Sequence, residues 1–325
     1  MKILDANILF VQSGIPFYYP SVETSIYNSL KKVVQVVTMV SSKEAIKTAV
    51  KTKPDFILVL HGLHEDFNYV IPLLKQFGFK VGIWLTDDPY YSDLTQHIVS
   101  HYDYVFTQDS GIIDFYQKIG CNNVFYLPLA SDQSLYKPNN DISSYKYDIS
   151  FLGTAFENRL SFIDSIADYL NQKSTCIVGY GWDKLKHYGL LKDKIKLMPL
   201  GTYEENLKYY TATKININMH RSIQDKTLNC NSLLLEAHSI NNRTFEIANS
   251  CAFQLTDVRV NLAKHYTPGV EIETFYSPTE FVTKSEYYLI HEKERLQIAE
   301  NGYKKTLRDH TYDQRVHQLL NKISI

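Results

Sequence analysis

One segment about three quarters of the way along the chain combines residue types that suit a phosphorylated ligand. It reads Arg243-Thr-Phe-Glu246-Ile-Ala-Asn-Ser-Cys-Ala-Phe-Gln254-Leu-Thr-Asp257, which predicts a short helix, a buried strand and an acidic turn. A helix N-terminus with a cation beside it attracts phosphate. A carboxylate one turn into the helix can accept hydrogen bonds from both hydroxyls of a ribose. Arg243 and Glu246 therefore point to a nucleoside diphosphate, and the surrounding sequence favours a sugar attached to it.

An ion pair within a solvated helix face is the plainer interpretation of the same two residues. Positions three apart lie on one side of a helix, so Arg243 and Glu246 could simply pair there. The apolar neighbours of Glu246, together with the apolar strand that follows, favour instead a buried carboxylate with a function.

Two further clusters follow apolar runs of the second half, where parallel strands are expected to end and where open α/β sheets bind ligands. Gly153 would let the backbone approach a phosphate, and Arg159 would clamp that phosphate from the start of a helix. A plain turn with a surface arginine explains that pair equally well. His220 could donate to a phosphate or a sugar hydroxyl while Arg221 adds charge; a structural histidine is the alternative.

The first half offers a weaker set of candidates. Asp87 and Asp88 close a buried strand before Pro89, and either could be the general base for an acceptor hydroxyl. They could equally cap the following turn. Because the two aspartates are adjacent and not separated by one residue, as in an Asp-x-Asp motif, we do not predict a metal site. Gly14, in the loop 13–16 after the first strand, is a candidate for contact with the diphosphate or part of an ordinary turn.

Length, charge and cysteine content limit the class of protein. A chain of 325 residues with 44% hydrophobic residues suits two domains of about 150 residues, each with its own core. A net charge of −1 without charge runs argues against nucleic acid as the main partner. Four scattered cysteines fit reduced thiols. No signal peptide and no span of ~20 apolar residues is evident, so we expect a soluble, cytoplasmic protein.

The order of short apolar runs and helical patterns predicts an α/β fold with two Rossmann-like domains facing a cleft. Strands are predicted at 8–12, 33–40, 55–60, 81–85, 104–107, 124–127, 148–152, 175–178, 214–219 and 252–255. Helices are predicted at 22–32, 42–51, 67–77, 111–119, 158–171, 204–210, 233–238, 244–249, 280–289, 292–307 and 312–323. Residues 127–140 are predicted to form the linker.

Several of these segments, in order, resemble the CgeB-type glycosyltransferases, a family of the GT-B superfamily named for a spore-maturation protein of bacilli. The segments are Asp87-Asp88-Pro89, Leu127-Pro-Leu-Ala130, Asp148-Ile-Ser-Phe-Leu-Gly153, Arg243-Thr-Phe-Glu246, Phe253-Gln254-Leu-Thr-Asp257, Pro268-Gly-Val-Glu-Ile-Glu273, Ile298-Ala-Glu-Asn-Gly302 and His310-Thr-Tyr312. They cover most of the chain from about residue 80 onward.

The resemblance implies an N-terminal acceptor domain (1–130), a nucleotide-sugar domain (131–305) and a last helix (306–325) returning to the first domain. It implies metal-independent transfer of a sugar, without a cofactor, from a donor such as a UDP-sugar to a glycan or protein-linked acceptor. Glu246 matches the ribose-binding glutamate of the family, and Gln254 and Asp257 fall in the same binding region. The resemblance also implies a location for the protein: the cytoplasm, for example that of a mother cell, or the spore surface.

Two departures from the family pattern limit what the resemblance implies. Cys251 stands where relatives often carry glycine, and His238 stands where many retaining enzymes carry a second glutamate, with Glu236 two residues away. The stereochemistry therefore stays open. Two other functions also stay open: a nucleotide-sugar epimerase of the same fold, and an inactive scaffold protein of the spore surface.

Overall fold

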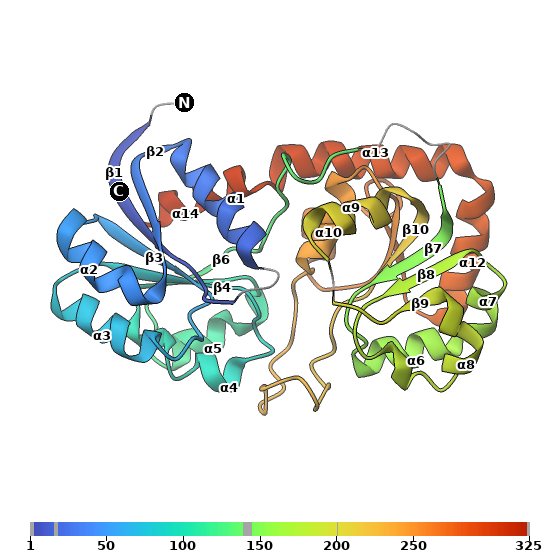
Figure 1. Cartoon of the computed structure of the whole chain (residues 1–325), viewed down its shortest axis with the longest axis horizontal. Coiled ribbons are helices and arrows are strands. Elements are labelled where there is room, and N and C mark those ends of the chain that lie inside the picture. The colour runs from blue at the N-terminus through green and yellow to red at the C-terminus, as the bar shows by residue number, and fades with distance from the viewer. Residues whose placement is uncertain (1–2, 16–18, 139–144, 200, 324–325) are drawn as a thin grey trace. The chain divides into compact units, whose positions relative to one another are not determined.

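The computed structural model describes residues 3–15, 19–138, 145–199 and 201–323. The chain divides into two compact units. Unit 1 comprises Met1–Leu129, Asn229–Ser239 and Tyr312–Ile325, and unit 2 comprises Ala130–Leu228 and Ile240–Thr311. Each unit is built around its own parallel sheet, so the predicted α/β class is confirmed (Figure 1). The predicted domain limits at residues 130 and 305 remain predictions.

Unit 1 contains a six-stranded sheet in the order β2-β1-β3-β4-β5-β6. All neighbouring strands are parallel, which requires helical crossovers. The strands are β1 (Leu4–Val11), β2 (Val34–Val40), β3 (Phe56–Leu60), β4 (Val81–Leu85), β5 (Tyr104–Thr107) and β6 (Val124–Tyr126). The helices are α1 (Tyr19–Lys31), α2 (Ser42–Thr52), α3 (Phe67–Gln76), α4 (Ser92–Thr95), α5 (Ile113–Lys118) and α14 (Tyr312–Ile323).

The central strands β3 and β4 are buried along their whole length, as the continuous apolar sequence predicted. The last helix, α14, belongs to this unit although it lies at the other end of the chain. It packs against α1, where Lys32 and Asp313 form an ion pair of 2.8 Å. The Arg315 side chain donates from Nε to the carbonyl of Pro128 at 2.9 Å.

Unit 2 contains the second parallel sheet, in the order β12-β11-β10-β7-β8-β9. Its strands are β7 (Tyr147–Leu152), β8 (Thr175–Val178), β9 (Ile195–Lys196), β10 (Thr213–Asn218), β11 (Gln254–Asp257) and β12 (Glu273–Phe275). Its helices are α6 (Glu157–Ser165), α7 (Ala167–Asn171), α8 (Tyr188–Leu191), α9 (Tyr203–Thr211), α10 (Asn242–Asn249), α11 (Leu262–His265), α12 (Pro278–Ile290) and α13 (Glu292–Asp309). In its core, Phe151 meets Trp182 edge to face, with ring centroids 5.0 Å apart.

The predicted helix at 233–238 is wrong, because this segment forms turns and irregular structure bound to unit 1. Its hydrogen bonds go to side chains instead of to a helical backbone. The Asp109 carboxylate accepts from the amides of His238 and Ser239, each at 3.0 Å. Asn231 accepts from the amide of Leu235 at 2.9 Å. Such side-chain bonds compete with helix formation, and helical periodicity in a leucine-rich sequence does not reveal them.

Smaller differences concern the ends of elements. The single helix predicted at 158–171 is two helices, α6 and α7, interrupted at Ile166. The predicted strand at 252–255 runs two residues later, as β11. Of the predicted linker, residues 139 and 140 lie outside the described residues. Among the helices that the structure describes, none is both long and apolar enough to cross a bilayer.

Candidate functional site

Glu246 lies in the interior of unit 2, on helix α10. Asn241 caps that helix, because its side chain accepts from the amide of Thr244 at 3.0 Å. The Glu246 side chain is only 4% exposed. Asn242 donates from Nδ2 to its Oε1 at 2.7 Å, and the Tyr210 hydroxyl donates to its Oε2 at 3.4 Å. A carboxylate this buried is not part of a solvated helix face, so the plainer interpretation of the motif does not describe it.

Arg243 is partly exposed at the first turn of the same helix. It lies beside the turn at Gly153. A methyl group built on Gly153 would lie 3.3 Å from Nη1 of Arg243 and 3.0 Å from Nη1 of Arg159. The fold therefore brings Arg243 to Gly153 and Arg159, two predicted site residues that are distant from it in sequence.

The conformation of Gly153 explains why glycine stands there. Its φ of 153° lies in a region that side-chain-bearing residues rarely adopt. Its amide donates to the carbonyl of Val178 at 2.9 Å, and its carbonyl accepts from Nε1 of Trp182 at 2.8 Å. At Gly179, a methyl group would lie 2.0 Å from the carbonyl oxygen of Gly153. Glycine is thus needed at the ends of both β7 and β8 for the two turns to approach each other.

Arg159 is almost fully buried, with 4% of the residue exposed. Its Nη1 donates to the carbonyl of Thr154 at 3.0 Å, and its Nη2 donates to the carbonyl of Met219. Its guanidinium also lies 4.6 Å from the centre of the Phe156 ring. These contacts hold the end of β7 against the end of β10. Contact of Arg159 with a phosphate stays a prediction.

His220 and Asp257 form a pair at the ends of β10 and β11. Nδ1 of His220 lies 2.5 Å from Oδ1 of Asp257, which also accepts from the His220 amide at 2.9 Å. Burial lowers the pKa of His220, although the Asp257 carboxylate opposes that shift. Burial alone would raise the pKa of Asp257, but the His220 ring and Arg259 outweigh it and lower that pKa. The pair is therefore a neutral imidazole beside an ionised carboxylate.

This charge state determines what His220 can offer to a ligand. The hydrogen on the ring belongs on Nδ1, because Nδ1 faces the ionised carboxylate. Nε2 then carries a lone pair, and it is buried without a hydrogen-bond partner among the described residues. An unpartnered buried acceptor is costly, so it indicates a place for a donor such as a sugar hydroxyl. Donation from His220 to a phosphate would need the hydrogen on Nε2, and that role stays a prediction.

Both polar atoms of the Gln254 side chain form hydrogen bonds within unit 2. Its Oε1 accepts from Nδ2 of Asn218 at 3.0 Å, and its Nε2 donates to the carbonyl of Thr244 at 2.9 Å. Nδ2 of Asn241 in turn donates to Oδ1 of Asn218 at 3.0 Å. This network joins β10 and β11 to the first turn of α10. It positions the helix N-terminus, whereas direct contact of Gln254 with a ligand stays a prediction.

Arg221 is partly exposed and follows His220 along the chain. Its guanidinium lies 4.8 Å from the centre of the Phe156 ring and donates to the carbonyl of Leu228. Arg159 and Arg221 thus both lie over the Phe156 ring. A positively charged region follows from this arrangement at the carboxyl edge of the second sheet.

In unit 1, Asp87 lies near a histidine that the sequence did not identify as a site residue. Nδ1 of His61 lies 3.6 Å from Oδ2 of Asp87 and 2.9 Å from the hydroxyl oxygen of Thr86. Burial lowers the pKa of His61, and Asp87 opposes the shift. The Asp87 side chain is 35% exposed, so it remains accessible to solvent. The role of Asp87 as a base stays a prediction.

Asp88 differs from its neighbour because it lies in the core of unit 1, with 1% exposed. It accepts from the hydroxyls of Thr107 at 2.6 Å and Tyr116 at 2.8 Å. Burial raises the pKa of Asp88 to about 7, although these two hydrogen bonds oppose the shift. The geometry is that of a structural carboxyl, and a catalytic role for Asp88 stays an untested prediction.

Gly14 follows β1 and has a φ of 79°. A methyl group on it would lie 3.1 Å from Cδ2 of His64. The preceding Ser13 is fixed by the buried Glu23, whose Oε1 accepts from its amide at 2.7 Å and its hydroxyl at 2.6 Å. Internal hydrogen bonds therefore hold the start of this loop. Pro16 lies outside the described residues.

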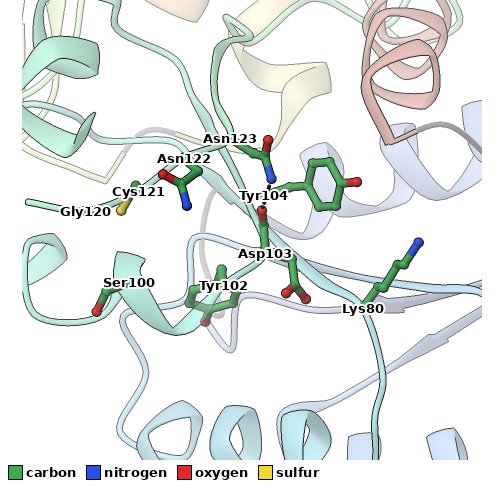
Figure 2. A pocket seen from close by; sticks show the side chains of 9 residues that line it. All are labelled: Lys80, Ser100, Tyr102, Asp103, Tyr104, Gly120, Cys121, Asn122 and Asn123. Carbon is green, nitrogen blue, oxygen red and sulfur yellow. Dashed lines mark hydrogen bonds between the residues drawn. The ribbon is translucent and has the colours of Figure 1, made fainter. Parts of the chain in front are cut away.

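A polar pocket of about 340 Å³ lies at the opposite edge of the first sheet, where β4, β5 and β6 begin (Figure 2). Its lining residues are Lys80, Ser100, Tyr102, Asp103, Tyr104, Gly120, Cys121, Asn122 and Asn123. None of the predicted site residues lines it. Ligands of open α/β sheets bind at the carboxyl ends of strands, so we do not assign the reaction to this pocket.

Comparison with known proteins decides the family. The model of the glycosyl transferase-like family matches residues 159–321, half of the chain. The chain belongs to the glycosyl transferase-like family. The match includes Arg159, His220, Arg243 and Glu246, and the predicted enzyme class, a glycosyltransferase, is confirmed.

Curated and solved relatives agree with this assignment. Spore protein CgeB of Bacillus subtilis (strain 168) is 27% identical over 314 residues, which is 95% of this chain and 96% of that protein. The structure of sucrose-phosphate synthase from Thermosynechococcus elongatus superposes with a TM-score of 0.70 at 10% identity, over 98% of both chains. Anabaena HepE, in complex with UDP and glucose, gives 0.69 at 11% identity, over 98% and 99%. The resemblance to CgeB and the GT-B fold are both confirmed.

Proposed function

We propose that this glycosyltransferase uses a nucleoside diphosphate sugar, most simply a UDP-sugar, as its donor. The observation that carries the proposal is the buried carboxylate of Glu246 one turn after Arg243, at the capped N-terminus of α10. The crystal structure of Anabaena HepE, which shares the fold, contains UDP and glucose, and this supports the choice of nucleotide. The acceptor would be a hydroxyl of a glycan or a protein-linked glycan.

Each group would act on a different part of the donor. The Glu246 carboxylate would accept hydrogen bonds from the ribose hydroxyls. Arg243 and the first amides of α10 would offset the charge that builds on the leaving diphosphate. Nε2 of His220 would accept from a hydroxyl of the sugar. We propose that cationic side chains supply this charge without a metal or a cofactor.

The likeness to CgeB suggests where such a reaction would be used. That relative is a spore protein, and this chain aligns with nearly its whole length. We therefore propose glycosylation of a spore-surface component as the biological role. Deletion of the gene should then remove a sugar from the surface glycans of spores, and unchanged glycan composition would contradict this role.

Calorimetric titration of the full chain with UDP and with UDP-sugars tests the donor site. Wild-type protein should bind, whereas Arg243→Gln and Glu246→Gln should each weaken binding about tenfold or more, because charge-assisted hydrogen bonds contribute ~1.5–3 kcal/mol. Glu300→Gln is a matched control, since the Glu300 side chain is 49% exposed on α13. If UDP and UDP-sugars at millimolar concentration give no heat, or the control weakens binding equally, the donor site is wrong.

The products distinguish transfer from epimerisation. A transferase releases UDP and lengthens an acceptor, whereas an epimerase changes the sugar and keeps it attached to the nucleotide. Release of UDP that increases with added glycan acceptor supports transfer. An altered UDP-sugar formed from donor alone would favour the epimerase.

A further inference from the structure

Helices α2 and α3 of unit 1 carry apolar side chains that nothing else in the described chain covers. The two helices lie side by side (Figure 1), and the Ser42 hydroxyl near the start of α2 donates to Asp66 before α3 at 2.8 Å. The exposed fractions are 49% for Val50, 77% for Tyr69, 40% for Leu73 and 59% for Phe77.

These residues form a row and are not scattered. Tyr69, Leu73 and Phe77 are four positions apart, so they follow one side of α3 and its C-terminus. The other side of the helix faces the core and buries Phe67, Val70, Ile71 and Leu74. Single exposed apolar residues are ordinary, but a contiguous row marks a surface that another body covers.

A row of lysines runs along the neighbouring helix. Lys43, Lys47 and Lys51 are also four apart, and Lys53 caps the helix. All four are exposed, and none has an ion-pair partner within the described ranges of the chain. Lysines near a helix C-terminus stabilise the helix dipole, which accounts for Lys51 and Lys53. Lys43 lies in the first turn, where a cation is unfavourable, so helix stability does not explain the row.

The acidic residues of this region lie at the opposite ends of the helices. Glu44 and Glu65 are exposed near the N-terminal ends of α2 and α3, and Asp66 is engaged by Ser42. Near the other ends, Asp55 accepts from the amide of Asn7 at 2.8 Å. Lys75 is paired with Asp103. The C-terminal ends therefore combine the unpaired Lys51 and Lys53 with the exposed Phe77, on a chain whose overall net charge is −1. Lys43 and Tyr69 lie nearer the N-terminal ends of the same two helices.

We infer that this α2–α3 surface, formed by the four lysines and the four apolar residues named above, docks on an anionic lipid bilayer. Tyr and Phe side chains suit the boundary between headgroups and acyl chains. Lysine heads reach the lipid phosphates while their stems cover apolar surface. Neither set would suffice alone, since stable surface binding needs both apolar insertion and electrostatic attraction. The surface would hold the enzyme where a lipid-linked or surface glycan is presented.

Cosedimentation of the full-length protein with vesicles tests this. Binding is expected to vesicles that contain phosphatidylglycerol, to weaken with added salt, and to be absent with phosphatidylcholine alone. A lysine near an anionic surface contributes about 1 kcal/mol, or about fivefold in partitioning, so Lys47→Gln with Lys51→Gln should lower partitioning about 30-fold. Lys184→Gln with Lys192→Gln, two exposed lysines of unit 2, removes the same charge as a control.

The apolar half of the surface has its own matched pair. Tyr69→Ser should reduce vesicle binding, whereas Tyr276→Ser should not, although Tyr276 is equally exposed at 79%. These surface changes leave both cores intact, so circular dichroism should be unchanged. The proposal is overturned if wild-type protein stays in the supernatant with anionic vesicles at low salt, or if control and test variants behave alike. If analytical ultracentrifugation shows a wild-type dimer that Tyr69→Ser dissociates, the surface would instead bind a second copy of the chain.

Discussion

Replacing Gly153 with alanine should damage both the stability of unit 2 and the binding of the donor. The added methyl group would lie 3.0 Å from Nη1 of Arg159 and 3.3 Å from Nη1 of Arg243, closer than ordinary van der Waals contact. The φ of 153° adds backbone strain. Strained backbone conformations cost ~1–3 kcal/mol each, which corresponds to a fall of several degrees in Tm. Displacing Arg243 should also raise the Kd for UDP about tenfold, a loss of about 1.4 kcal/mol.

Two other glycines of unit 2 separate the causes. Gly269 has a φ of 76° but open space around its added methyl group, so Gly269→Ala introduces strain without crowding. Gly189 lies in α8 without a positive φ or a close neighbour, so Gly189→Ala introduces neither. Differential scanning fluorimetry and calorimetry with UDP should give reduced affinity for Gly153→Ala alone. If Gly153→Ala and Gly269→Ala bind UDP equally well, the guanidinium groups beside Gly153 do not hold the diphosphate.

Three further predictions concern buried charged groups. Arg159→Lys should lower the free energy of unfolding, measured in urea, by ~2–3 kcal/mol. One ammonium group cannot bond both strand-end carbonyls while lying over Phe156. Unchanged stability would show that these contacts of Arg159 are dispensable. Asp88 has a pKa of about 7, raised from 3.8, so its protonated form is favoured by folding, and the stability of the wild type relative to Asp88→Asn should fall as pH rises from about 4 to about 7; a difference that does not change with pH in denaturant titrations would refute the buried titration. The lowered pKa of His220 keeps its ring neutral above pH 6.5, so the transfer rate should not fall through loss of a His220 proton between pH 6.5 and 8; a decline there that His220→Gln abolishes would require the protonated ring.

The sequence was sufficient to predict most strands and the edge of each sheet where the candidate residues lie. Continuous apolar runs identified β3 and β4, and the residues after each strand were placed at one edge by the geometry of parallel sheets. The apolar neighbours of Glu246 correctly predicted its burial. Each of these inferences needs only local sequence and a known direction of the strand.

Other features depend on contacts between distant segments, which one sequence does not contain. His61 follows β3 and Asp87 follows β4, and their proximity requires knowing that these two strands are neighbours in the sheet. The bonds from Arg159 to the carbonyls of Thr154 and Met219 could not be predicted, because they join the ends of two strands that are distant in sequence. Its contact with a phosphate stays a prediction. The hydrogen-bond network of Asn218 was not predicted, because an amide at a strand end gives no signal of a network until its partners are known.

The most direct test of the central claim compares UDP with 2′-deoxy-UDP in wild-type and Glu246→Gln protein. A buried carboxylate that accepts from the ribose should make the wild type prefer UDP by about tenfold, because a hydrogen bond to a charged group contributes ~1.5–3 kcal/mol. The Glu246→Gln protein should lose most of that preference, so the two changes are not additive. If the preference for UDP is the same in both proteins, Glu246 does not hold the ribose, and the donor site proposed on α10 is wrong.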